Sequence, residues 1–272
     1  MKKLKTIILT LVMGIFGNLF GQNKHIENFE FFNRNENEII QFIVVDIGLN
    51  EIAPINSKPN ILKISFQMKR VNEAGLSSSK EELNVFGEIE DKLIEKLTKD
   101  ELFVGRITSN GLRDFYFYTK DNKIQATFEE ILKKYNQFKY TINFEVDENW
   151  NKYFQLLYPN EEEFQKIGNR SVLDNLEEGG DNLTLEREVF HWIYFKTEND
   201  RENFIKEIEK LNFSIVTKSK IKDAFPFQLQ IKRVDKVDEE SVNQYVIQLW
   251  KLAPKYNGSY DGWETSIETT NK

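Results

Sequence analysis

Two spacings of apolar residues alternate along the chain, one with a period of two and one in which they recur every three or four positions. The first predicts strands and the second predicts amphipathic helices. In the first half, the pattern predicts strands at 38–47, 61–71, 102–108, 113–118 and 138–146, helices at 80–98 and 126–135, and a short helix at 150–157. Asn110-Gly111 falls between two of these strands and is typical of a tight hairpin turn.

The second half shows the same mixture of periods. The pattern predicts helices at 171–177, 199–211 and 239–252, and strands at 189–195, 213–217, 227–234 and 263–267. From residue 189 onward the order is β-α-β-β-α-β, as in ferredoxin-like folds, and the first half repeats it after one extra leading strand. We therefore expect an α+β protein of two ferredoxin-like domains. Each would pack its helices on one face of an antiparallel sheet and leave the other face available to a partner.

The first residues predict a targeting segment. Lys2, Lys3 and Lys5 precede an apolar stretch at 6–20, and Gly21 supplies a small residue for cleavage. This arrangement is typical of a secretory signal peptide, and the apolar stretch is short for a membrane span. We expect a signal peptide at 1–22, export to the periplasm or beyond, and no stable membrane insertion after cleavage. An uncleaved anchor and a cytoplasmic helix are the alternatives.

The amino-acid composition limits which metal sites, cofactors and reactions the protein can have. The 272 residues include no Cys and only 2 His, and Asp plus Glu exceed Lys plus Arg by 44 to 37, a net charge of −7. Disulfides, Cys-ligated zinc and iron–sulfur clusters are excluded, and the acid excess disfavours direct nucleic-acid binding. No phosphate-binding, dinucleotide-binding or zinc-protease motif occurs, so we expect no cofactor. His25 follows the cleavage site in a segment that we expect to be mobile. His191 is expected to be a sheet histidine paired with a neighbour.

Two chemical alternatives stay open. With 44 acids, a hydrolase that uses paired carboxylates is possible in principle. The run 257–268, NGSYDGWETSIE, fits the spacing of a calcium-binding EF-hand loop, with Gly262 at the sixth position and Glu268 at the twelfth. Its first ligand would be Asn257 rather than Asp, and the residues that follow read as a strand. We therefore favour a structural turn that leads into the last strand.

Four segments stand out from residue 171 onward: VLDNLEEGGDNL at 172–183, FHWIYF at 190–195, LNFSI at 211–215 and YDGWET at 260–265. In these segments the chain resembles the regulator of ribonuclease activity B family, whose members inhibit ribonuclease E. The resemblance implies an acidic α+β domain at 165–272 that binds the ribonuclease as a protein partner and has no active site of its own. An exported copy would not reach that ribonuclease, so an exported chain would bind another protein.

The first half contains Ala74-Gly75-Leu76, Glu90-Asp91, VGRITSNGLRDFYFY at 104–118, Asp147-Glu148-Asn149-Trp150 with Tyr153, and LLYP at 156–159. In these pieces it resembles the domain-of-unknown-function family 695. The resemblance implies a domain at 23–160, before a polar, acidic boundary at 160–168. It implies no activity.

These observations predict a non-enzymatic, exported module that binds another protein. A cytoplasmic regulator of ribonuclease E and a carboxylate-dependent hydrolase are the alternatives. The binding surface would combine acidic residues with the exposed side of the second sheet. We expect it to include Glu177, Glu178, Tyr260, Asp261, Gly262, Trp263 and Glu264.

Overall fold

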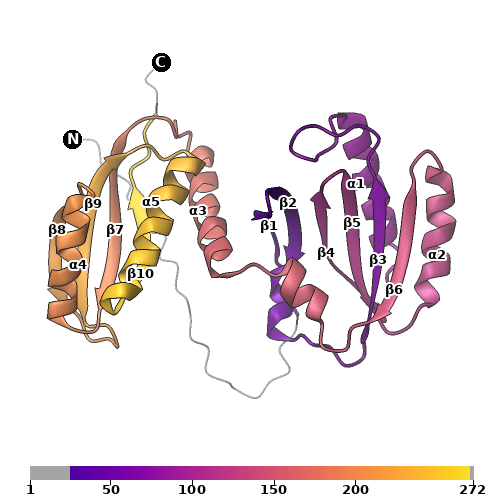
Figure 1. The fold of residues 1–272 in the computed structure, drawn as a ribbon, viewed down its shortest axis with the longest axis horizontal. Helices are drawn as coiled ribbons and strands as arrows, with labels where there is room; N and C mark the ends of the chain where they lie inside the picture. Colours follow the sequence, from indigo (N-terminus) through magenta and orange to yellow (C-terminus); the bar gives the residue numbers. More distant parts are fainter. Residues whose placement is uncertain (1–24, 270–272) are drawn as a thin grey trace. The chain divides into compact units, whose positions relative to one another are not determined.

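The computed structural model describes residues 25–269, and these fall into two compact units that divide between Glu163 and Phe164. The predicted signal peptide at 1–22 lies outside the described residues. In the part of the chain from 25 to 269, no helix has the length and apolar character needed to cross a membrane. Both units combine helices with one antiparallel sheet, so the predicted α+β class with two domains is confirmed (Figure 1).

The first unit is a six-stranded antiparallel sheet with two helices on one face (Figure 1). Its elements are β1 (Phe29–Glu36), β2 (Ile39–Asp46), β3 (Asn60–Gln67), α1 (Lys80–Ile94), β4 (Glu101–Ser109), β5 (Leu112–Thr119), α2 (Lys123–Leu132) and β6 (Tyr140–Val146). The strand order is β1-β2-β4-β5-β3-β6, so the last four strands have the arrangement of a ferredoxin-like sheet. The Asn110-Gly111 turn joins β4 to β5 with positive φ at both residues, as predicted.

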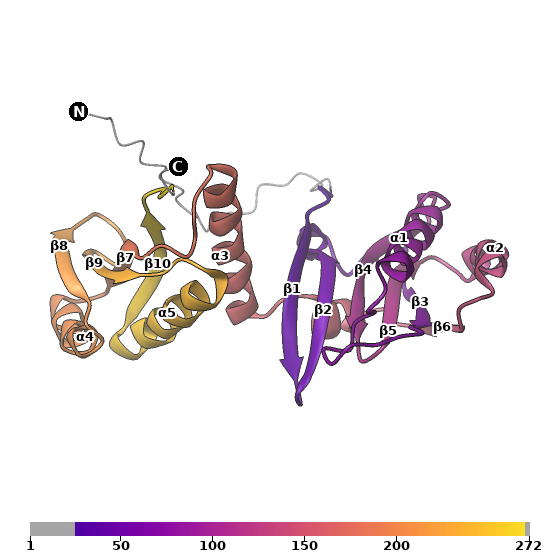
Figure 2. The ribbon, with the colours of Figure 1, turned by 90° about the horizontal axis from the view of Figure 1, so that it is seen from above.

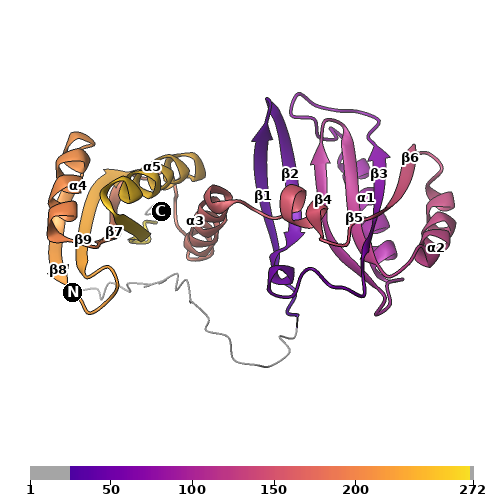
Figure 3. The ribbon, with the colours of Figure 1, turned by 60° about the horizontal axis from the view of Figure 1, so that its bottom comes forward.

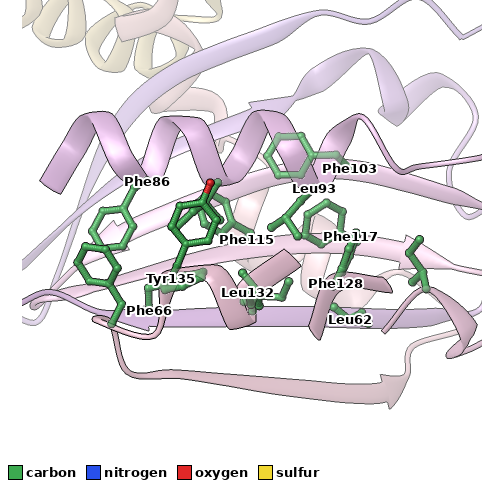
Figure 4. Packing of buried hydrophobic residues seen from close by; sticks show 14 of the residues in the cluster. Leu62, Phe66, Phe86, Leu93, Phe103, Phe115, Phe117, Phe128, Leu132 and Tyr135 are labelled. Atoms are coloured by element: carbon green, nitrogen blue, oxygen red, sulfur yellow. The ribbon is translucent and has the colours of Figure 1, made fainter. Parts of the chain in front are cut away.

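Aromatic packing holds α1 and α2 on this sheet. Phe86 from α1 and Phe128 from α2 are fully buried against Phe66, Phe115 and Phe117 from the strands (Figure 4). The ring centroids of Phe117 and Phe128 lie 4.9 Å apart, and those of Phe66 and Phe86 lie 5.6 Å apart. Many of the Phe residues of the sequence therefore lie in the core of this unit.

One strand of the first unit was not predicted. Two strands precede the ferredoxin-like order instead of one, because residues 29–36 pair with β2 as a hairpin. The turn between them uses Asn37 and Glu38, both with positive φ. Glu rarely occupies this conformation, so the sequence carries no turn signal at this point.

Residues 150–157 lie on the face of this sheet that α1 and α2 leave uncovered. The last turn of this segment, Tyr153–Leu157, is a π-helix where a short amphipathic helix was predicted. The Trp150 indole stacks on the Tyr118 ring with centroids 3.9 Å apart, and the Tyr153 hydroxyl donates to the Asp46 carbonyl at 2.8 Å. Trp150 and Tyr153 are fully buried, which explains why aromatics occur so densely here.

The second unit is a four-stranded antiparallel sheet of order β10-β7-β9-β8, the strand order of a ferredoxin-like fold. Its elements are α3 (Glu161–Glu178), β7 (Arg187–Phe195), α4 (Glu198–Lys210), β8 (Ser214–Lys220), β9 (Phe227–Asp235), α5 (Glu239–Leu252) and β10 (Gly258–Thr265). Leu173 and Leu176 of α3 pack with Val189, Val242 and Trp263, and α4 packs on the same side. α4 and α5 therefore cover one face of the sheet, and α3 stands beside its β10 edge (Figure 2).

Two elements in this half begin earlier than predicted. The helix expected at 171–177 begins at Glu161, so the acidic segment 160–168, within which the two units divide, forms its first turns. Asn160 and Glu163 cap this helix reciprocally, each accepting the backbone N–H of the other at 2.9 and 2.8 Å. The last strand begins at Gly258 rather than at 263, because it starts directly after the left-handed Asn257.

Candidate protein-binding face

Among residues 25–269, no helix layer covers one face of the second sheet, and β7 is one of its two central strands. Successive side chains of a strand point to opposite faces. Val189, His191, Ile193 and Phe195 are fully buried on the helix side. The alternate positions Phe190, Trp192 and Tyr194 are half-buried and point to the other side, which the helices do not cover (Figure 3).

Polar residues of β9 and β8 surround this aromatic row. The Lys232 ammonium lies 5.7 Å from the centroid of the Phe190 ring and pairs with Glu188. The Gln228 amide donates to the Tyr194 hydroxyl at 2.8 Å. These contacts hold the rings that flank Trp192 in defined positions.

An outward-facing row of aromatic side chains is unusual on a sheet face that is exposed only to solvent. Outward positions of an antiparallel sheet with one solvated face are normally polar. Tyr, Trp and Phe are enriched at protein–protein interfaces, and Trp and Tyr in particular contribute most of the binding energy there. We call Phe190, Trp192, Tyr194, Gln228, Gln230, Lys232 and Glu264 the binding face. It is the candidate functional site of the chain.

The last strand brings part of the predicted site to this face. Gly262 pairs with Trp192 and Glu264 pairs with Phe190, so both positions belong to the same side as the aromatic row. Asp261 is the extra residue of a β-bulge in β10 and is exposed. Burial raises the pKa of both the Asp261 and the Glu264 carboxyl groups.

The other predicted site residues lie on the helix side of β10 or on α3. Trp263 points to the helix side, is 8% exposed and donates its indole N–H to Asn169 Oδ1 at 2.9 Å. The Tyr260 hydroxyl also lies on that side. Glu177 and Glu178 are exposed at the end of α3, the helix beside the β10 edge. Trp263 and Tyr260 therefore stabilise the strand instead of contacting a partner directly.

His191 has the environment predicted for it. Its Nδ1 lies 2.9 Å from the Tyr260 hydroxyl, and the imidazole is completely buried beneath the helices. Burial, with a further contribution from the Arg233 charge, lowers the pKa of His191 to about 3. The expectation of a sheet histidine paired with a neighbour is confirmed, and the ring is neutral and out of reach of a substrate.

His25 is held in place by an acid. Its Nε2 lies 2.7 Å from Asp46 Oδ2, while the backbone N–H groups of Asn28 and Gly48 donate to Asp46 Oδ1 at 2.9 and 3.0 Å. Both oxygens of the buried Asp46 carboxylate therefore have hydrogen-bond partners, and these contacts hold residues 25–28 against the rest of the first unit.

Residues 257–268 form the turn and last strand that the sequence favoured over a calcium-binding loop. Residues 258–265 form β10, which spreads the potential ligands along an extended strand instead of folding them around an ion. Across residues 25–269, no group of three or more His, Asp or Glu side chains could hold a metal ion.

A second surface feature lies in the first unit. A cleft of about 240 Å³ opens on the sheet face opposite α1 and α2. Its lining residues are Ile61, Lys63, Tyr116, Asn143, Glu145, Lys152 and Leu156. Lys63 lies 3.4 Å from Asp114, and Lys152 lies 3.5 Å from Glu145, so each cation already has a carboxylate beside it.

Sequence reasoning missed the aromatic row itself. In FHWIYF, apolar residues occupy both faces of the strand, so periodicity does not distinguish the buried side from the outward one. The only available signal was the excess of aromatics at alternate positions of a strand whose sheet has helices on one face.

Comparisons with known proteins agree with both predicted resemblances. Residues 27–158 match the model of a family described as "Family of unknown function (DUF695)", and residues 166–265 match "Regulator of ribonuclease activity B". No curated protein matches the chain. Among solved structures, the chain is similar to the crystal structure of an unknown protein from Galdieria sulphuraria, with 10% sequence identity, a TM-score of 0.21, and coverage of 77% of this chain and 99% of that one. The two family assignments and their order are those predicted from the sequence.

Proposed function

We propose that this chain, a DUF695 domain followed by a regulator of ribonuclease activity B domain, is a regulatory protein that binds another protein through the binding face. The observation that carries the proposal is the outward row of Phe190, Trp192 and Tyr194 on a sheet face without helices. The family match supports it, because members of the second family regulate a ribonuclease by binding it. The proposal assigns no catalytic residue to the chain.

We also propose that the protein acts outside the cytoplasm. The support is the run of Lys2, Lys3 and Lys5 before an apolar stretch and a small residue. Fractionation of the native host with intact-mass analysis tests this part. A mature protein that begins near Gln22 and lies outside the cytoplasm is the expected result, and a full-length cytoplasmic protein would overturn it.

The second candidate is a cytoplasmic inhibitor of ribonuclease E, and the match of residues 166–265 favours it. It predicts that the full-length chain slows RNA cleavage by purified ribonuclease E in proportion to the occupied enzyme. Unchanged cleavage at saturating protein would remove this candidate and leave a different partner for the binding face.

Site-specific photocrosslinking in the native host tests the proposed function itself. A photoreactive residue replaces Gln230, which pairs with Trp192 on the binding face, and in a second protein it replaces Glu209, which is exposed on α4. We expect one discrete crosslinked protein from position 230 and none from position 209. The crosslink at 230 is expected to disappear when Trp192→Ala is added. Equal crosslinking from both positions would contradict the proposal.

A further inference from the structure

We propose that β7 and β10 form a notch on the binding face that accepts an arginine or lysine side chain of the partner protein. The notch consists of Trp192, Asp261, Gly262 and Glu264. This inference rests on the proposed function, because it names the chemistry of the partner segment that the binding face would recognise.

The space in the notch comes from Gly262. This residue pairs directly with Trp192 across the two strands, and a Cβ atom placed on it would meet nothing within 4 Å. The indole therefore has no side chain beside it on the β10 side. Gly262 also has a φ of +152°, at the bulge that Asp261 creates. Glycine adopts this conformation without the strain that a side chain would add.

The charge in the notch comes from two carboxylates without a cation. Among the residues that the structure describes, neither Asp261 nor Glu264 has a hydrogen-bond or ion-pair partner. Phe190 of β7 pairs with Glu264 on β10 and with Lys232 on β9, so Lys232 is the cation closest to Glu264 in the strand pairing. Lys232 forms its ion pair with Glu188 of β7. Partial desolvation without a compensating cation raises the pKa of both carboxyl groups, although the Asp261 side chain is also accessible to solvent.

These parts together fit a basic side chain. Tryptophan is the aromatic residue that attracts a cation most strongly on its ring face, and Arg also stacks on the ring. The carboxylates of Asp261 and Glu264, on either side of Gly262 along β10, can accept the N–H donors of a guanidinium or ammonium group. The net charge of −7 on the chain adds a long-range attraction for a basic segment. A segment of the partner rich in arginine or lysine is therefore the occupant that the notch selects.

Nuclear magnetic resonance on the full chain tests the notch, with a peptide of four Gly-Arg repeats as the probe. The chain has 4 Trp residues, and a Trp192→Phe protein identifies the indole N–H signal of Trp192. We expect this signal to shift on titration and to saturate. The double variant Asp261→Asn, Glu264→Gln is expected to weaken the response about tenfold or more.

A matched control has the same change in charge on the helix side. Glu209→Gln with Glu240→Gln neutralises two exposed acids on α4 and α5. We expect it to bind the peptide as the unmodified chain does. Equal losses in both double variants, or a peptide that leaves the Trp192 signal unmoved, would overturn the inference.

The two proposals fail in different ways. If the partner crosslinked at position 230 still depends on Trp192 but binds the Asp261→Asn, Glu264→Gln protein normally, the face binds a protein and the notch is wrong. If crosslinking at position 230 does not depend on Trp192, the proposed function fails first.

Discussion

Trp263 on β10 and Asn169 on α3 form a buried hydrogen bond, in which the indole N–H donates to Oδ1 at 2.9 Å. The amide group of Asn169 in turn donates to Asn243 on α5, also at 2.9 Å. The tryptophan of the YDGWET motif therefore joins the last strand to two helices. Its neighbours Asp261, Gly262 and Glu264 lie on the other side of the strand or at its edge, so one short motif serves both stability and the binding face.

Replacing Trp263 by Phe should destabilise the second domain without affecting the binding face directly. The change removes the donor for the buried Asn169 Oδ1 and leaves a small void, which together cost about 2–4 kcal/mol of unfolding free energy. Urea denaturation followed by circular dichroism measures the loss. Trp192→Phe is the control, because Trp192 is half-buried on the open face and its indole N–H has no such acceptor. Equal effects of the two changes would contradict this assignment.

His191 should make the stability of the second domain depend on pH. Burial, and then the Arg233 charge, lower its pKa from the usual histidine value of 6.5 to about 3 in the folded chain. Between these values the unfolded chain binds a proton that the folded chain does not. Stability is therefore fully present above about pH 6.5 and falls as the pH falls towards 3. Between pH 7 and pH 4 the loss is on the order of 3 kcal/mol.

Parallel denaturation series for the unmodified chain and for His191→Gln check this prediction. The variant lacks the titrating group, so its stability should fall less steeply over the same pH range. Other acids titrate in both proteins, and the difference between the two slopes isolates His191. Identical slopes would show that His191 is already protonated, or accessible to water, in the folded chain.

Arg34 should be sensitive to a change that keeps its charge. Its guanidinium donates to both carboxylate oxygens of Glu163 at 2.7 and 2.8 Å, and to the carbonyls of Leu156 and Tyr158 at 2.7 and 3.0 Å. Lysine cannot reproduce this planar set of donors, so Arg34→Lys should lower the unfolding free energy by about 2 kcal/mol. Thermal denaturation measures the change. Lys123→Ala, which breaks an exposed ion pair with Asp121, should leave the midpoint unchanged.

Much of the fold was predictable because local signals agreed with the tertiary structure. The helix at 239–252 and the turn at Asn110-Gly111 were located from spacing and turn chemistry alone. The missed strand at 29–36 has a turn made of Asn37 and Glu38, which carries no recognisable signal. The missed start of α3 at Glu161 resembled a solvated linker because its first turn is acidic, although acids at that position favour a helix.

The candidate site was predicted only in part, for a physical reason. Asp261, Gly262 and Glu264 follow from the motif, but the sequence does not show that Trp263 turns inward while Trp192 turns outward. That distinction depends on which face of the sheet the helices cover, and the apolar run 190–195 fits either choice. The bulge at Asp261 also shifts the register, which the alternation pattern does not reveal.

The affinity of the protein crosslinked at position 230 for three purified chains decides whether the outward row on β7 binds a partner. These are the unmodified chain, Trp192→Ala, and Trp250→Ala as a matched change on the helix α5. Melting temperatures confirm that each variant is folded. If the outward row on β7 is the binding surface, Trp192→Ala binds about tenfold more weakly or worse, and Trp250→Ala binds like the unmodified chain. Normal binding by a folded Trp192→Ala protein would contradict the account.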